Sequence, residues 1–211
     1  MVRAPEDWQP TIRRGRSLAR ERDPAAVDLL ISALRWRYDT ARNQAVEILA
    51  SLGPLSEPRL LSTLESADTA VERRAAAMAL GRMNSARATP LLMRALRDPN
   101  MSVRRSAAVA LLEMRIPEAV PRLVRLLRDE SGGVRVLAAN VMARFGDRSA
   151  VPALVRALRD DKWYVRQAAA RALGELRDPR ALGALTKARR DARPAVAKAA
   201  ARALSVLAKS E

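Results

Sequence analysis

The sequence contains no cysteine and no histidine among its 211 residues. A disulfide framework is therefore excluded, and the chain has no thiolate or imidazole ligand for a metal ion. The same absences exclude acid–base catalysis by histidine and nucleophilic pairs built from cysteine or from serine and histidine. We therefore expect no metal, no cofactor and no catalytic residue.

Aromatic residues and long apolar runs are also scarce. Only 3% of the residues are aromatic although 49% are hydrophobic, and alanine and leucine supply most of the apolar content. This balance favours closely packed helices over a β-sandwich. No stretch approaches ~18 uninterrupted apolar residues, and the first 23 residues lack an apolar segment of signal-peptide length. We expect a cytoplasmic protein without a membrane span.

Positive charge is what the sequence has in excess, with a formal net charge of +16 that comes almost entirely from arginine. Residues 1–85 carry 13 basic and 11 acidic groups, net +2, whereas residues 86–211 carry 26 and 12, net +14. Such an excess favours a nucleic acid, an acidic protein or another anionic surface as partner. The arginine codons of a GC-rich genome would produce the same excess without any function.

The chain repeats itself every 31 residues, as shown by "VRRSAA" from Val103, "VRVLAA" from Val134 and "VRQAAA" from Val165. Each unit contains two segments with apolar residues at i, i+3, i+4 and i+7, the spacing of one helical face. One helix pair cannot bury such a face alone, whereas stacked neighbours can. The sequence predicts six repeats, which start near residues 24, 55, 86, 118, 149 and 180.

The phrase "VRQAAARALGELRDPRALGAL", from Val165 to Leu185, resembles a HEAT repeat of the short PBS-lyase HEAT-like type. The resemblance implies an all-α fold, a right-handed α-solenoid formed by residues 24–211, with first helices on the convex face and second helices on the concave face. Residues 1–23 fit the repeat poorly. We expect them to form an irregular N-terminal cap, in which Ile12 and Leu18 would lay a short basic helix over the first repeat.

In proteins of this type, an acid at the end of the first helix and an arginine six residues later form a ladder that ties the repeats together. Charge-assisted hydrogen bonds between these groups would fix the turns. In this chain the structural ladder is predicted to contain Asp98, Arg104, Asp129, Arg135, Asp160 and Arg166.

The second helices carry a surface that a helical wheel directs away from the core, apolar in the middle of the chain and basic toward its C-terminal end. The resemblance makes this surface the concave wall, and an apolar patch that folding leaves open usually marks a partner site. We predict that a protein segment binds there, unless neighbouring helices or a homodimer cover Val109 and Leu112. The predicted contacts are Met78, Arg105, Val109, Leu112, Val136, Asn140 and Arg171, and Gly81 and Gly174 occupy equivalent positions.

A further set of basic residues lies on the first helices, where the wheel directs it into water. It is either a solvated face or a ridge that binds an anion or a nucleic acid. The set consists of Arg94, Arg97, Arg125, Arg128, Arg156, Arg159, Lys187 and Arg190.

Two adjacent aromatic residues, Trp163 and Tyr164, occupy a turn that other repeats fill with different residues. Local packing against the preceding turn is one interpretation of this pair. The other is contact with a partner protein or with a nucleic-acid base.

The leading hypothesis is a non-catalytic scaffold that binds a protein partner through its concave face. The alternative is a nucleic-acid-binding protein, related to DNA repair, that uses the basic C-terminal repeats. Proteins with this resemblance also include iron hydroxylases, which need histidine, and bilin lyases or chaperones, which no motif here separates from scaffolds. DNA glycosylases of similar architecture would require Trp163, Asp160, Asp161 and Arg166 for catalysis, but Asp160 and Arg166 already belong to the predicted ladder.

Overall fold

The computed structural model describes residues 7–208. Over these residues the chain forms thirteen α-helices and six 3-10 helices and no β-strand element, so the predicted all-α repeat fold is confirmed. No helix in this part of the chain combines the length and the apolar character that crossing a bilayer requires.

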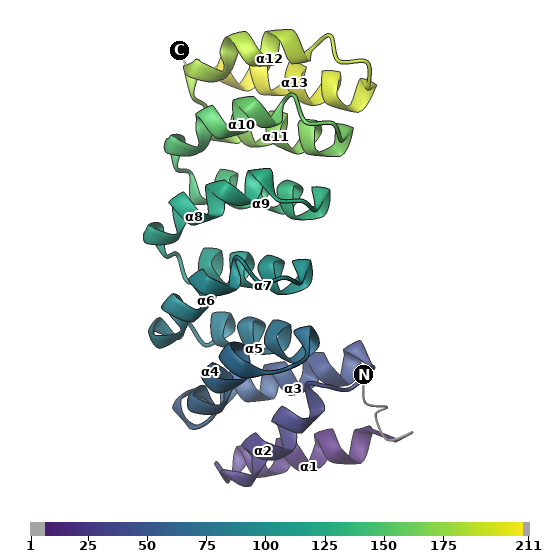
Figure 1. Cartoon of the computed structure of the whole chain (residues 1–211), viewed down its shortest axis with the longest axis vertical. Coiled ribbons are helices and arrows are strands. Elements are labelled where there is room, and N and C mark those ends of the chain that lie inside the picture. Colours follow the sequence, from purple (N-terminus) through teal and green to yellow (C-terminus); the bar gives the residue numbers. More distant parts are fainter. Residues whose placement is uncertain (1–6, 209–211) are drawn as a thin grey trace. The chain divides into compact units, whose positions relative to one another are not determined.

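The chain divides into two compact units, residues 1–114 and 115–211, whose helices are labelled in Figure 1. The first unit contains α1 (Gln9–Arg20), α2 (Ala25–Ala33), α3 (Asp39–Ser51), η1 (Gly53–Leu55), α4 (Glu57–Ser66), α5 (Ala70–Arg82), η2 (Ala86–Ala88), α6 (Thr89–Ala95) and α7 (Met101–Glu113). The second contains η3 (Pro117–Ala119), α8 (Val120–Arg125), η4 (Leu126–Arg128), α9 (Gly132–Phe145), η5 (Arg148–Ala150), α10 (Val151–Ala157), α11 (Trp163–Leu176), η6 (Pro179–Ala181), α12 (Leu182–Ala188) and α13 (Pro194–Leu207).

Short first helices alternate with longer second helices, as the 31-residue pattern predicts. Proline within the first turn suits the start of α4, α6, α8 and α10, because its missing N–H has no intrahelical acceptor there. Each first helix packs against its own second helix, and the second helices pack side by side. In the first unit α5 contacts α3 and α7, and in the second unit α11 contacts α9 and α13 (Figure 1).

A column of alanines and a column of larger residues form the core of both units. The alanines have no accessible surface, which lets neighbouring backbones approach closely; they are Ala45, Ala76, Ala107, Ala138, Ala169 and Ala200. The larger residues are also fully buried, and include Leu49, Leu80, Leu111, Met142 and Leu173. Both columns follow the helical periodicity seen in the sequence.

Residues 9–20 of the expected N-terminal cap form the helix α1, which is the short basic helix expected over the first repeat. Ile12 is 2% exposed, and α1 packs against α2 and α3. Gly15 allows this contact, because a Cβ atom at that position would lie 2.7 Å from the side chain of Leu30. Leu18 is partly exposed.

A left-handed residue follows α1 and then recurs at intervals of 31 residues, once after each second helix as far as α11. The six residues have φ between 49° and 73°; they are Arg22, Gly53, Asn84, Arg115, Gly146 and Arg177. A residue in this conformation ends a helix by turning the chain away. Because Arg22 follows α1 in the same register, α1 occupies the place of a second helix in the repeat.

Candidate binding surfaces

The ladder arginines join two consecutive repeats through the different nitrogens of their guanidinium groups. Arg135 donates to both carboxylate oxygens of Asp160 at 2.7 and 2.8 Å, and to the carbonyl of Asp129 at 2.8 Å. Arg166 repeats the arrangement with Asp191 at 2.7 and 3.0 Å and with the carbonyl of Asp160 at 2.8 Å. The charged partner is therefore the acid of the next repeat, 25 residues further on, and the acid six residues earlier contributes only its backbone.

The first unit contains the same contacts. Arg73 donates to Asp98 at 2.8 and 3.1 Å and to the carbonyl of Ala67 at 2.8 Å. Arg104 is 6% exposed and donates to the carbonyls of Asp98 and Pro99 at 2.9 and 3.0 Å. In the second unit, the carboxylate of Asp129 caps its own turn by accepting the amide N–H of Ser131 at 2.9 Å.

Hydrogen bonding changes the ionisation of the ladder acids. The Arg166 guanidinium lowers the pKa of Asp191, with a further contribution from the amide N–H of Arg193. Burial acts to raise the pKa of Asp98, but the hydrogen bonds from Arg73 and from the amide of Asn100 outweigh it, so that pKa is also lowered. Both carboxylates therefore remain charged at neutral pH and hold the adjacent repeat.

The predicted second-helix surface is only partly open. Arg105, Asn140 and Arg171 are exposed, and Met78, Val109 and Val136 are partly exposed. Leu112 is 8% exposed, so its assignment to an open apolar patch is wrong. The buried residues of α7 extend from Val103 to Leu112, and its buried face is wider than a wheel drawn for one helix pair indicates.

Two glycines assigned to the same surface instead lie between second helices. A Cβ atom on Gly81 of α5 would lie 2.6 Å from the Cβ of Ala110 in α7. A Cβ atom on Gly174 of α11 would lie 2.9 Å from the Cα and Cβ of Ala203 in α13. Both positions are buried helix contacts rather than parts of an open wall, and glycine is needed because the neighbouring backbone is so close.

A cavity of about 680 Å³ lies between α11 and α13 on the second-helix side; we call it the inter-helix groove. Small residues line it together with the exposed cations Arg171, Lys198 and Arg202, none of which forms an ion pair with a described residue. Glu175 is the one acid in the lining. The full lining is Gln167, Arg171, Gly174, Glu175, Arg177, Ala195, Lys198, Ala199, Arg202, Ala203 and Val206.

Trp163 and Tyr164 are 39% and 38% exposed, and their rings meet edge to face with centroids 5.8 Å apart. Tyr164 reaches the start of α9, where a Cβ atom on Gly132 would lie 2.7 Å from the Tyr164 hydroxyl oxygen. Tyr164 therefore packs against the neighbouring helix α9 rather than against the preceding turn, and its contact with a partner stays a prediction. Trp163 lies four residues before Gln167 and eight before Arg171, on the helix face that borders the inter-helix groove.

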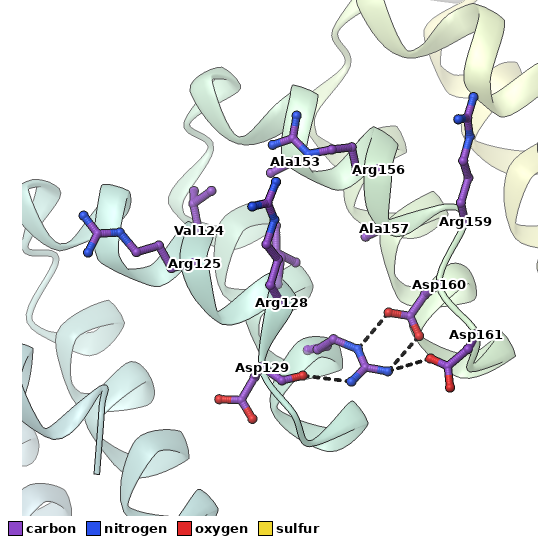
Figure 2. Close-up of a pocket in the computed structure, with 12 residues that line it drawn as sticks. Val124, Arg125, Arg128, Asp129, Ala153, Arg156, Ala157, Arg159, Asp160 and Asp161 are labelled. Atoms are coloured by element: carbon purple, nitrogen blue, oxygen red, sulfur yellow. Dashed lines mark hydrogen bonds and ion pairs between the residues drawn. The ribbon is translucent and has the colours of Figure 1, made fainter. Parts of the chain in front are cut away.

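The basic residues predicted on the first helices are all exposed. In the first unit Arg94 pairs with Glu65 at 3.0 Å. In the second unit, Figure 2 shows Arg125, Arg128, Arg156 and Arg159 around a cavity of about 530 Å³ between α8–η4 and α10, which we call the arginine groove. These four side chains have no ion-pair partner among the described residues, and Lys187 and Arg190 have none either.

Among the ion pairs between repeats that were missed from the sequence, three join residues about one repeat length apart. Asp28 pairs with Arg59 at 3.2 Å, Glu57 with Arg87 at 3.0 Å and Glu65 with Arg94 at 3.0 Å. The partners are 31, 30 and 29 residues apart. An acid and a base separated by about one repeat length is the signal that would have found them.

Comparison with known proteins agrees with this fold. A sequence profile of HEAT repeats matches residues 57–135 and 123–205. No curated protein sequence matches the chain. An engineered protein of known structure is 22% identical with a TM-score of 0.60, covering 87% of this chain and 96% of that one.

Two further solved structures are similar. Human deoxyhypusine hydroxylase in complex with glycerol is 22% identical with a TM-score of 0.54, covering 97% of this chain and 81% of that one. A designed armadillo repeat protein in complex with the peptide (KR)4 is 21% identical with a TM-score of 0.59, covering 86% and 99%. At these identities the similarity shows the fold alone.

Proposed function

Because the chain belongs to the HEAT-repeat family, we propose that it is a non-catalytic scaffold that binds an acidic segment of a partner protein in the inter-helix groove. The observation that carries the proposal is the lining of that groove, in which Arg171, Lys198 and Arg202 have no acidic partner within residues 7–208 and lie among small apolar residues. This surface includes the C-terminal part of the predicted concave wall, where Arg171 was expected to contact a partner.

The size of the groove suits an extended peptide. The helices α11 and α13 have 14 residues each, and at 1.5 Å per residue each is about 21 Å long. An extended chain rises about 3.3 Å per residue, so about six residues would lie along them. Gly174, Ala199 and Ala203 are buried beneath this surface, so no bulky side chain from these positions fills the groove.

The charge of the lining favours acidic peptide side chains. Arginine presents a planar fork that binds a carboxylate through two parallel hydrogen bonds. The designed armadillo repeat protein of similar fold is in complex with the basic peptide (KR)4. The cations of the inter-helix groove favour a peptide of the opposite charge. Trp163, on the adjoining face of α11, would add an aromatic contact at one end of the groove.

The contacts of the acids considered for catalysis support a structural role. The Asp160 and Asp161 carboxylates both accept hydrogen bonds from Arg135, the latter at 3.0 Å. Arg166 is held by Asp191. The side chains that a glycosylase mechanism would need are thus occupied in tying repeats together.

The test uses a fluorescein-labelled octapeptide of alternating glutamate and leucine, with alternating lysine and leucine as the control peptide. We expect the full chain to prefer the acidic peptide at least 10-fold. An inter-helix variant, Arg171→Gln with Lys198→Gln and Arg202→Gln, should weaken that binding at least 10-fold, because hydrogen bonds to charged groups contribute about 1.5–3 kcal/mol each.

The matched control is a first-helix variant, Arg125→Gln with Arg128→Gln and Arg156→Gln. It removes the same number of positive charges, but from the first helices of the same unit. It should bind the acidic peptide as the unaltered chain does. Equal weakening in both variants would show that net charge alone attracts the peptide, and equal affinity for both peptides would also contradict the proposal.

A further inference from the structure

The first helices of the second unit contain no acidic residue. The helices α8, α10 and α12 have the sequences VPRLVR, VPALVRA and LGALTKA. The arginine groove lies between the first two, and its four free guanidinium groups come from two consecutive repeats (Figure 2). Positive charge on this side is therefore concentrated and has no counter-charge on the first helices.

The first unit shows that the fold does not require this arrangement. There, acids on α2 and α4 pair with arginines one repeat further on, and the pairs are Asp28 with Arg59, Glu57 with Arg87 and Glu65 with Arg94. The equivalent cavity of the first unit contains the pair of Arg94 and Glu65 in its lining. In the first unit these pairs offset basic residues of the first-helix side, whereas Arg125, Arg128, Arg156 and Arg159 of the second unit have no ion-pair partner within residues 7–208.

The acids that line the arginine groove already accept hydrogen bonds from other groups of the protein. Asp160 and Asp161 are bound by Arg135 at the base of the groove, and Figure 2 shows these contacts beside the free arginines. Asp129 accepts the amide N–H of Ser131. An anionic ligand would therefore meet four guanidinium groups whose charge no carboxylate in the groove offsets through a direct ion pair.

The basic residues also recur with the repeat. In the second unit each repeat has two of them, three residues apart in the sequence: Arg125 and Arg128, Arg156 and Arg159, and Lys187 and Arg190. Packed helices lie about 8–10 Å apart, and one strand of B-DNA rises about 3.4 Å per nucleotide. Successive pairs that followed the duplex axis would thus be spaced by roughly three base steps.

We propose that the first-helix side of the second unit binds the phosphate backbone of duplex nucleic acid, with Arg125, Arg128, Arg156 and Arg159 as the principal contacts. Arginine suits phosphate because its fork donates two hydrogen bonds to one anion. No aromatic residue lines the groove, so the stacking platform typical of single-strand binding is missing there. Contacts to phosphate alone position a protein without reading base sequence.

This site is independent of the inter-helix groove, since it involves other helices and another class of partner. The test measures binding of the full chain to a fluorescent 20-base-pair DNA duplex by anisotropy, at several salt concentrations between about 50 and 200 mM. We expect binding at the lowest salt, no preference between two unrelated sequences, and an affinity that falls steeply with salt.

The two triple variants defined above serve as each other's controls. The first-helix variant should weaken duplex binding at least 10-fold and reduce the slope of log K against log salt by about 2.7, since each phosphate contact contributes about 0.9. The inter-helix variant, with the same net charge, should leave both quantities close to those of the unaltered chain. Circular dichroism and the melting temperature check that both variants fold.

Three outcomes would overturn the proposal. The first is absence of duplex binding at 50 mM salt. The second is equal weakening by the two variants, which would mean that only the net charge is sensed. The third is loss of the acidic octapeptide, rather than of the duplex, in the first-helix variant, which would make the arginine groove a protein-binding site.

Discussion

Gly174 of α11 and Ala203 of α13 are so close that a Cβ atom added to the glycine would lie 2.9 Å from both the Cα and the Cβ of the alanine. Gly81 and Ala110 have the same relationship in the first unit. The second helices therefore meet backbone to backbone at these points. A larger residue would force them apart.

Gly174→Ala should lower the free energy of unfolding by about 1–3 kcal/mol, the usual cost of overfilling a packed interior. Urea denaturation followed by circular dichroism measures the change. The control is Gly183→Ala in α12, where no atom lies within 4 Å of the added Cβ. That change should be neutral or stabilise the protein by about 0.5–1 kcal/mol, and equal stability of the two variants would contradict the close contact.

Arg135→Ala should cost about 3 kcal/mol of stability. Its side chain and that of Asp160 are each 11% exposed, so removal of the arginine leaves a largely buried carboxylate without its partner. Arg94→Ala is the matched control, because its ion pair with Glu65 has 69% and 52% of the side-chain surfaces exposed. An exposed pair of this kind contributes less than about 1 kcal/mol. Similar losses in both variants would show that the ladder is no more than a surface feature.

Stability should fall on acidification as Asp178 takes up a proton. The hydrogen bonds of the Arg180 side chain lower the pKa of this buried carboxyl to about 2, against about 3.9 in an unfolded chain. A lowered folded pKa stabilises the protein above pH ~4, and this contribution is lost as the pH falls through about 2.

Unfolding free energies measured between pH 5 and 2 test this sign. Asp178→Asn should remove this contribution entirely, whereas Arg180→Gln should remove only part of it, because the backbone amide of residue 180 and the charge of Arg148 still lower the pKa of Asp178. A residual slope is expected from Asp98 and Asp191, whose pKa values are also lowered. A slope that neither substitution changes would contradict the role of the Asp178–Arg180 pair.

Arg177→Gly should stabilise the chain by about 0.5–1 kcal/mol. Arg177 ends α11 with φ 49° and ψ 46°, a conformation that costs a residue with a Cβ about 1–2 kcal/mol, of which the flexibility of glycine returns part. Arg189→Gly is the control, since Arg189 has φ −60° and should lose stability instead. Thermal melting of both variants distinguishes the signs.

The sequence was sufficient for the period, the two-helix unit and the buried columns, because these depend on apolar spacing alone. Ala169 and Leu173 follow directly from that spacing. The burial of Leu112 was not predictable in this way, since it depends on how many neighbours α7 has, and a wheel represents one helix. The same holds for Gly174, whose partner Ala203 lies on the next second helix.

The charged contacts were likewise predictable from the sequence only in part. That Arg135 and Asp160 belong to a ladder was predictable from their recurrence, but their pairing across two repeats required the stacking of the units. The exposure of Arg125 and Arg156 was predicted from the wheel, whereas the ion pair of Arg94 with Glu65 depends on side-chain reach between helices. Sequence periodicity thus assigns a side chain to a face, and the neighbouring repeat determines its partner.

The left-handed residues have a consequence for how the chain can be cut and rejoined. Gly146 and Arg177 leave their helices in the same conformation, and each is followed by an aspartate that caps the next 3-10 turn: Asp147 accepts the amide of Ser149 and Asp178 that of Arg180. Removing residues 147–177 would join Gly146 to Asp178 with the backbone already matched on both sides of the splice. Evolution can therefore shorten or lengthen the protein by whole repeats of 31 residues.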